Sequence, residues 1–169
     1  MKENEKVKVG VCNYPDYPFL VTREEGILDA LKEFAPNANV EVTAKAGYTP
    51  EGVDVGDAWV QSNKDLNVVV GINDAGVLGV YESFKSAGIK NDKLGMFGGD
   101  AVDDALAAIE EGGAFKATVS TNMLKNANYF IDMAVELAKN GKLEEREKLF
   151  PLEGITADNV AEYKKSIEE

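Results

Sequence analysis

The order of apolar and periodic segments is the feature that most restricts the fold of this chain. Five times, a short apolar run is followed by a segment with helical periodicity, and the runs cover residues 6–12, 40–46, 66–72, 94–97 and 116–120. Strands that alternate with helices in this way form a parallel sheet with helices on both faces. The middle run contains Val68, Val69 and Val70, which is typical of a central strand buried on both faces. The pattern therefore predicts a three-layer α/β/α fold with a doubly wound, parallel, five-stranded sheet.

Capping signals predict where the helices begin. Thr22 and Glu25 have the spacing of a capping box for the first helix, which ends at Pro36. The apolar stripe of this helix is expected to be buried and consists of Ile27, Ala30, Leu31 and Phe34.

The next three helices follow the second, third and fourth strands. The second helix begins at Thr49, and Gly52 and Gly56 lower its helix propensity. The third follows Asn73 and ends at Gly88, a residue suited to a left-handed cap. The fourth is expected to bury Val102, Ala105, Leu106 and Ile109.

The 169 residues fit one domain with two attached segments. We expect a disordered extension over residues 1–5, a ligand-binding α/β lobe over 6–121 and a helical segment over 122–169. The helical segment is predicted to contain a long helix at 122–140, a charged link and a short terminal helix capped by Thr156.

Composition excludes several classes of function. With 30 acidic and 18 basic residues the net charge is -12, which repels phosphate backbones and anionic membranes, so no nucleic-acid partner is expected. The chain has no histidine, the commonest zinc ligand and the usual proton carrier near neutral pH. Its single cysteine, Cys12, lies in an apolar run and is interpreted as a buried structural thiol. Residues 1–6 lack the apolar stretch of a signal peptide, and no segment reaches the length of a membrane span.

Motifs for nucleotides and cofactors are missing. The chain has no Walker-type Gly-Lys-Ser/Thr sequence and no complete G-x-G-x-x-G after the first strand. It also lacks the acidic pair of a magnesium-binding receiver domain and the phosphate loop of a flavodoxin. We therefore expect no cofactor and no metal.

Polar side chains gather in the loops that follow the five strands. In a doubly wound sheet these loops share one edge, and small ligands bind there. Carboxylates, amides and guanidinium groups read sugar hydroxyls, and an aromatic face covers the apolar side of a sugar ring. The candidate ligand-binding residues at this edge are Arg23, Tyr48, Asn73, Asp74, Asp100 and Thr121.

Structural roles compete with ligand binding at most of these positions. Asn73 and Asp74 are equally suited to capping the third helix. Asp100 fits a turn after two glycines, and Tyr48 fits the rim of a glycine turn. Arg23, placed in the first turn of its helix, has the wrong charge sign for the helix dipole, which favours a ligand contact.

The stretch VVVGINDAGVLG at residues 68–79 resembles the strand and helix start of type I periplasmic binding proteins for sugars. Similar correspondences cover almost the whole chain after Lys6, namely TREEG at 22–26, residues 97–100 with 105–112, ATVS at 117–120 and ITADNVAEY at 155–163. The match is to the C-terminal lobe of that family, which is a flavodoxin-like lobe. The family's N-terminal lobe has no counterpart here, so we interpret the chain as an isolated domain.

This resemblance implies a non-catalytic function. One lobe of a substrate-binding protein would hold a small sugar or polyol for the permease of an ABC transporter. The parent protein would be periplasmic or extracellular and could carry a lipid anchor. Arg23, Asn73 and Asp100 would contact the ligand, with Tyr48 as an aromatic contributor. The family often has Gln where this sequence has the shorter Thr121, which leaves that contact and the exact sugar open.

Two alternative functions remain open. The lobe also fits the effector-binding half of a lac-repressor-type regulator, and Asp74 with Asp100 would suit a carboxylate-based enzyme.

In the family that the chain resembles, the segment after the last strand crosses to the other lobe. Helix 122–140 is therefore expected to dock on its own lobe or to form a homodimer with a second copy.

Overall fold

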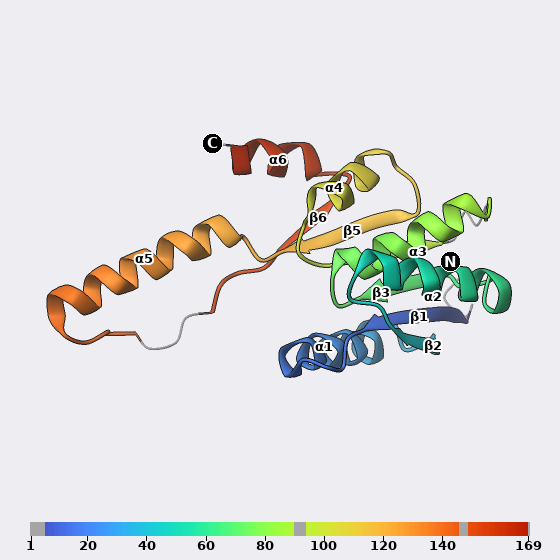
Figure 1. The fold of residues 1–169 in the computed structure, drawn as a ribbon, viewed down its shortest axis with the longest axis horizontal. Coiled ribbons are helices and arrows are strands. Elements are labelled where there is room, and N and C mark those ends of the chain that lie inside the picture. The colour runs from blue at the N-terminus through green and yellow to red at the C-terminus, as the bar shows by residue number, and fades with distance from the viewer. Residues whose placement is uncertain (1–5, 90–93, 146–148, 169) are drawn as a thin grey trace.

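The computed structural model describes residues 6–89, 94–145 and 149–168, which form one mixed sheet with helices on both faces (Figure 1). The expected extension at 1–5 lies outside these residues. The strands are β1 (Val7–Asn13), β2 (Ala38–Lys45), β3 (Val68–Gly71), β4 (Gly95–Phe97), β5 (Phe115–Ser120) and β6 (Glu153–Thr156). The helices are α1 (Pro18–Phe34), α2 (Thr49–Ser62), α3 (Asp74–Ser86), α4 (Asp103–Glu110), α5 (Met123–Asn140) and α6 (Val160–Glu168).

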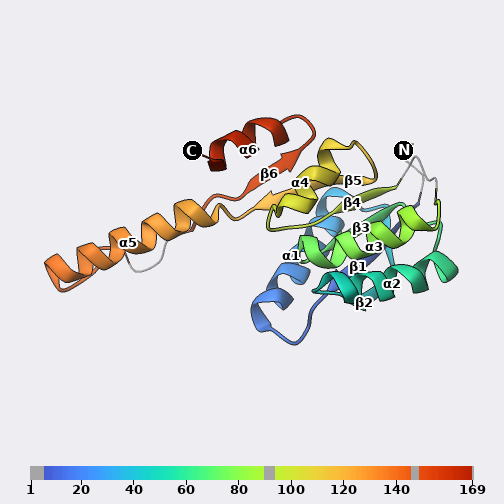
Figure 2. The ribbon, with the colours of Figure 1, turned by 45° about the horizontal axis from the view of Figure 1, so that its top comes forward.

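The sheet has the order β2-β1-β3-β4-β5-β6. The first five strands pair in parallel, as predicted, but β6 adds an antiparallel sixth strand beside β5 (Figure 2). The segment 122–169, expected to be helical, thus returns to the sheet after α5. Ile155 is the buried residue of β6 and aligns with Thr118 of β5. A four-residue strand with one buried side chain has no recognisable alternation, which explains why the sequence did not predict it.

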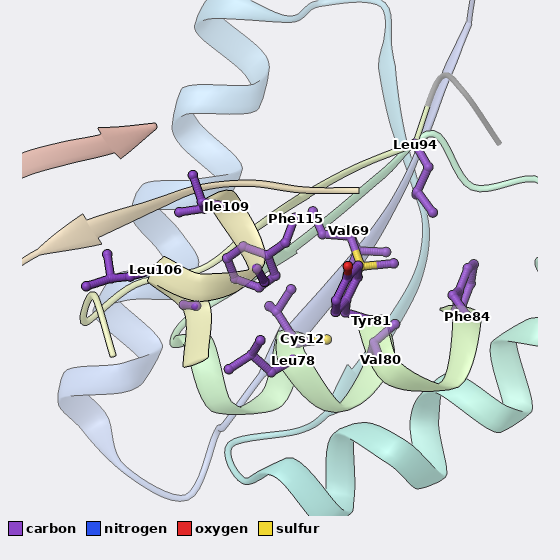
Figure 3. Packing of buried hydrophobic residues seen from close by; sticks show 14 of the residues in the cluster. Cys12, Val69, Leu78, Val80, Tyr81, Phe84, Leu94, Leu106, Ile109 and Phe115 are labelled. Carbon is purple, nitrogen blue, oxygen red and sulfur yellow. The ribbon is translucent and has the colours of Figure 1, made fainter. Parts of the chain in front are cut away.

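Alternate residues of β1 pack on opposite faces of the sheet. Val9 and Val11 pack with Leu28 and Leu31 of α1 on one face. Cys12 belongs to the larger core on the other face, together with residues of α2, α3 and α4 (Figure 3). The prediction of a buried thiol is confirmed, and burial raises its pKa to about 12, so Cys12 is an unreactive thiol at neutral pH.

Glycines bring α2 and α3 into backbone contact. A Cβ on Gly56 would lie 2.7 Å from the Ser83 Cβ, and one on Gly52 would overlap the Gly76 carbonyl oxygen. The two glycines that weaken α2 as an isolated helix are therefore required for its packing against α3.

The predicted start of the first helix is wrong. Helix α1 begins four residues before the proposed capping box, with Tyr17 as its N-cap and Pro18 at its first position. Thr22 lies inside the helix, where its Oγ1 donates to the Pro18 carbonyl over 3.3 Å. Phe34 is 78% exposed because it lies at the end of α1, beyond the sheet.

The start of α4 also differs from the prediction, whereas the cap before α6 agrees with it. Val102 is the exposed N-cap residue before α4 and does not belong to its buried stripe. Thr156 ends β6, and its N–H donates to the Asn159 Oδ1 over 2.8 Å. The Asp158 N–H donates to the Thr156 Oγ1 over 3.3 Å, so Thr156 caps the turn that leads into α6, as expected.

Helix α5 extends away from the sheet (Figures 1 and 2). The expectation that it docks on its own lobe is therefore wrong, because its apolar residues, including Met123, Phe130, Ile131 and Leu137, remain exposed. The side chain of Leu124, another member of the expected stripe, lies outside the described residues. Within the described ranges, no helix combines the length and apolar character needed to cross a membrane.

Candidate functional site

Arg23 and Asp100 meet at the carboxyl edge of the sheet although 77 residues separate them. The Arg23 Nη1 donates to the Asp100 Oδ1 over 2.9 Å and to the carbonyl oxygen of Ile72 over 2.8 Å. Both side chains are about one third exposed. Because α1 begins at Pro18, Arg23 lies in its second turn. The helix dipole acts mainly on charges in the first turn, so the expectation that the dipole disfavours Arg23 is wrong.

The loop that carries Asp100 has a strained backbone. Asp100 and Ala101 have φ angles of 104° and 56°, which residues with a side chain rarely adopt. The Asp100 N–H donates to the Val119 carbonyl over 2.8 Å, and the Ala101 N–H donates to the Thr118 Oγ1 over 3.1 Å. These bonds to β5 hold the carboxyl group of Asp100 toward Arg23, and strain held in this way is common at binding sites.

Asp74, a candidate ligand contact, is fully buried beneath this loop. Its Oδ1 accepts from the Thr118 hydroxyl over 2.7 Å, and its Oδ2 accepts from the Val102 N–H over 3.0 Å. Burial raises the pKa of Asp74 to about 6, partly opposed by the hydrogen bond from Thr118. The carboxyl group therefore supports the loop from inside and does not face the edge where a ligand would bind.

Asn73 caps α3 and still has hydrogen-bonding capacity for a ligand. Its Oδ1 accepts from the Gly76 N–H over 3.1 Å and caps α3. Its Nδ2 donates to the Gly47 carbonyl over 2.7 Å, which ties the loop after β2 to the loop after β3. An amide has a second proton and a second lone pair, so the half-exposed Asn73 side chain can still pair with a ligand.

The remaining predicted residues lie in neighbouring loops of the same edge. Tyr48 precedes α2 and is exposed. Thr121 follows β5, two residues after the strand position that binds Asp100, and its carbonyl accepts from the Asn126 Nδ2 over 2.8 Å. The structure thus brings Arg23 and Asp100 together directly and places the other three exposed candidates in adjoining loops.

Three aromatic residues at this edge were not predicted as site residues. Tyr14, Tyr17 and Phe19 follow β1 and, with Tyr48 and Asn73, line a hollow of about 270 Å³. The sequence signal was present as the aromatic-rich stretch NYPDYPF at residues 13–19. The prediction weighed only the polar groups of that loop.

A second hollow, of about 360 Å³, lies along α3 and α4 and is lined by residues such as Tyr81, Lys85 and Glu111. It contains none of the predicted site residues. Within the described residues, no group of three or more cysteine or acidic side chains is placed to hold a metal ion.

Sequence comparison identifies the family. Residues 4–143 match the model described as "Periplasmic binding protein domain". The chain belongs to this family. The family consists of binding proteins, in agreement with a lobe whose polar groups gather at one edge of the sheet.

Two curated proteins are similar to this chain in sequence. A putative rhizopine-binding protein of Rhizobium meliloti is 32% identical over 113 residues, which are 67% of this chain and 36% of that protein. A D-galactose/methyl-galactoside binding periplasmic protein of Haemophilus influenzae is 30% identical over 119 residues, or 64% of this chain and 35% of that protein. The chain thus spans little more than a third of the length of these relatives.

Solved structures of binding proteins share the fold of this chain. A Bacillus halodurans ABC transporter solute binding protein with bound myo-inositol is 25% identical, with a TM-score of 0.82, and the alignment covers 96% of this chain and 55% of that one. A periplasmic ribose ABC transporter protein from Conexibacter woesei aligns at 20% identity with a TM-score of 0.84, over 95% of this chain and 54% of that one. The predicted α/β lobe and its family are therefore confirmed.

Proposed function

We propose that this chain binds a small sugar or polyol, without catalysis, as one lobe of an ABC-transporter substrate-binding protein. The observation that carries the proposal is the Arg23–Asp100 pair beside Asn73 at the carboxyl edge of the sheet. Within the described residues, the Arg23 bonds engage Nη1, and a guanidinium has three further N–H donors on Nη2 and Nε. Donors and acceptors held side by side are what adjacent hydroxyls of a sugar or cyclitol require.

The relatives support this choice of ligand and of cellular role. Their names refer to a rhizopine, galactosides, ribose and myo-inositol, and two of those names refer to ABC transporters. We propose by analogy a periplasmic or extracellular location for the whole protein and a permease as its partner. These names favour transport over the lac-repressor-type regulator. The burial of Asp74 removes the exposed carboxylate pair on which the enzyme alternative depended.

Replacing Arg23 with alanine tests the site directly. We expect the affinity of this chain for its best sugar or polyol to fall about 10- to 100-fold, because each charge-assisted hydrogen bond contributes roughly 1.5 to 3 kcal/mol. The measurement is an NMR titration with D-ribose, D-galactose and myo-inositol. Lys32→Ala, which removes an exposed cation from the same helix, is the matched control and should leave the affinity unchanged. Equal losses in both variants, or no loss in Arg23→Ala, would count against the proposed site.

The chain by itself is expected to bind weakly. A two-lobed receptor with micromolar affinity has a binding free energy of about -8 kcal/mol, and half of that corresponds to a dissociation constant of roughly 1 mM. Titration calorimetry and NMR should therefore detect binding only at millimolar sugar. Micromolar affinity for a monosaccharide would show that one lobe suffices and that contacts are not shared between two.

For the isolated chain we also propose a homodimer through α5. Phe130 is 62% exposed although the Phe150 ring meets it edge-on, and Ile131 and Leu137 are exposed on the same helix. In an antiparallel pair of α5 helices, Phe130 would face Ile131 of the second copy, and Ala127 would face Ala134, where small residues permit close approach. Sedimentation should show a dimer that Phe130→Glu dissociates and that Asn128→Glu, on the same helix, leaves intact. A monomer at every concentration would exclude this interface.

A further inference from the structure

The aromatic hollow at the carboxyl edge is formed by residues from three loops. Tyr14, Tyr17 and Phe19 come from the β1–α1 connection, Tyr48 precedes α2, and Asn73 precedes α3. Phe19 is 64% exposed, and Tyr17 and Tyr48 are about half exposed. Such large apolar side chains would normally be covered, so their grouping around one hollow of about 270 Å³ distinguishes it from scattered surface aromatics.

Tyr14 is the buried side chain that fixes this hollow. Its ring lies directly against Gly47, where any Cβ would overlap the ring. Tyr17 stacks on Tyr14 with centroids 5.6 Å apart and ring planes at 10°, and Tyr48 meets Tyr14 edge-on at 5.6 Å. The Lys45 Nζ lies 4.5 Å from the Tyr14 centroid, a cation–π contact on the same ring. The arrangement of Tyr17 and Tyr48 is thus set by a packed residue beneath them.

The hollow is continuous with the Arg23–Asp100 site. Leu20, which lines the hollow, lies one helical turn before Arg23 on α1. Asn73 lines the hollow as well, and Arg23 binds the carbonyl of Ile72, the residue before Asn73. A ligand held by Arg23 and Asn73 therefore has this aromatic surface directly beside it.

We propose that the hollow is a subsite for a second ring joined to the sugar, as in a glycoside or disaccharide. The proposal rests on the function proposed above, because Arg23, Asn73 and Asp100 would hold the first ring. Aromatic faces attract the C–H face of a sugar or the face of an aryl group, and a tyrosine hydroxyl can form hydrogen bonds with hydroxyls at the ring's edge. The preferred ligand is accordingly larger than a monosaccharide.

Paired glycosides provide the test. The chain is titrated by NMR with methyl β-D-galactopyranoside and phenyl β-D-galactopyranoside, and with the two corresponding glucosides. We expect the phenyl glycoside of the bound sugar to bind about tenfold more tightly than its methyl glycoside, the gain expected from one aromatic contact with its buried area. Lactose, which carries a second sugar ring, should share part of that gain over methyl galactoside.

Phe19→Ala should abolish the phenyl advantage and leave the affinity for the methyl glycoside unchanged. Phe34→Ala removes an equally exposed phenylalanine from the other end of α1 and should change neither value. Equal affinity for methyl and phenyl glycosides, or an advantage that survives Phe19→Ala, would refute the second-ring subsite and would leave the aromatic surface for another lobe or a second copy. If no sugar, polyol or glycoside binds even at high millimolar concentration, the proposed function itself fails, and the subsite fails with it.

Discussion

Replacing Gly79 with alanine is expected to lower the free energy of unfolding by about 3 kcal/mol or more. A Cβ at this position would overlap the Thr49 carbonyl oxygen and lie 2.6 Å from the backbone N of Val53. Both obstacles belong to the backbone of α2, so no side-chain rotation can relieve them. The helices would have to separate, which would disturb the packed core beneath them. Urea denaturation followed by circular dichroism measures the loss.

Gly26→Ala is the matched control, because Gly26 is also a helical glycine but has no atom near its Cβ position. This substitution is expected to stabilise the protein by roughly 0.5 to 1 kcal/mol, since alanine is the better helix former. A loss below about 1 kcal/mol in Gly79→Ala, at an unchanged denaturant slope, would mean that α2 and α3 are not in backbone contact.

The unfolding free energy should fall by roughly 2 to 2.5 kcal/mol between pH 4 and pH 7 because of Asp74 alone. Burial raises the pKa of this carboxyl group to about 6 in the folded state, while in the unfolded chain it titrates near its ordinary value of 3.8. Between these values the folded state binds more protons than the unfolded state. The stabilisation is thus complete below the unfolded pKa and is lost as the pH rises through the folded pKa.

Asp74→Asn provides the reference, because asparagine keeps the shape but does not titrate. The difference in unfolding free energy between the original chain and this variant should decrease toward neutral pH and then remain constant above about pH 7. The carboxyl carbon resonance of Asp74 gives the folded pKa independently. A difference that is flat from pH 4 to pH 7, or a resonance that titrates near 4, would contradict the burial of the charge.

Both predictions concern the support of the candidate site. The Gly76 N–H donates to the Asn73 Oδ1, and a Cβ on Gly76 would overlap the Ala46 carbonyl oxygen. Asp74 and Thr118 hold the strained backbone at Asp100. Destabilisation of either support is therefore expected to weaken the proposed sugar binding, although Gly79 and Asp74 are themselves buried.

The sequence by itself determined the elements that depend on local pattern. The apolar runs around Val9 and Val69 predicted buried parallel strands, and both residues are fully buried. The same alternation placed Arg23, Asn73 and Asp100 at one edge, because the carboxyl ends of parallel strands meet there. Periodicity of side chains is a property of a few neighbouring residues, so it can be read without knowledge of the rest of the fold.

Only the tertiary structure decided which groups meet. It paired Arg23 with Asp100, buried Asp74 beneath the loop, and made Gly52 a contact of α3. It also added β6 to the sheet and left Met123, Ile131 and Leu137 of α5 exposed. Each of these outcomes depends on the path of the chain between distant segments. The sequence pattern around a carboxylate that follows a strand is the same whether the side chain is exposed or buried. Its burial depends on how the surrounding segments pack.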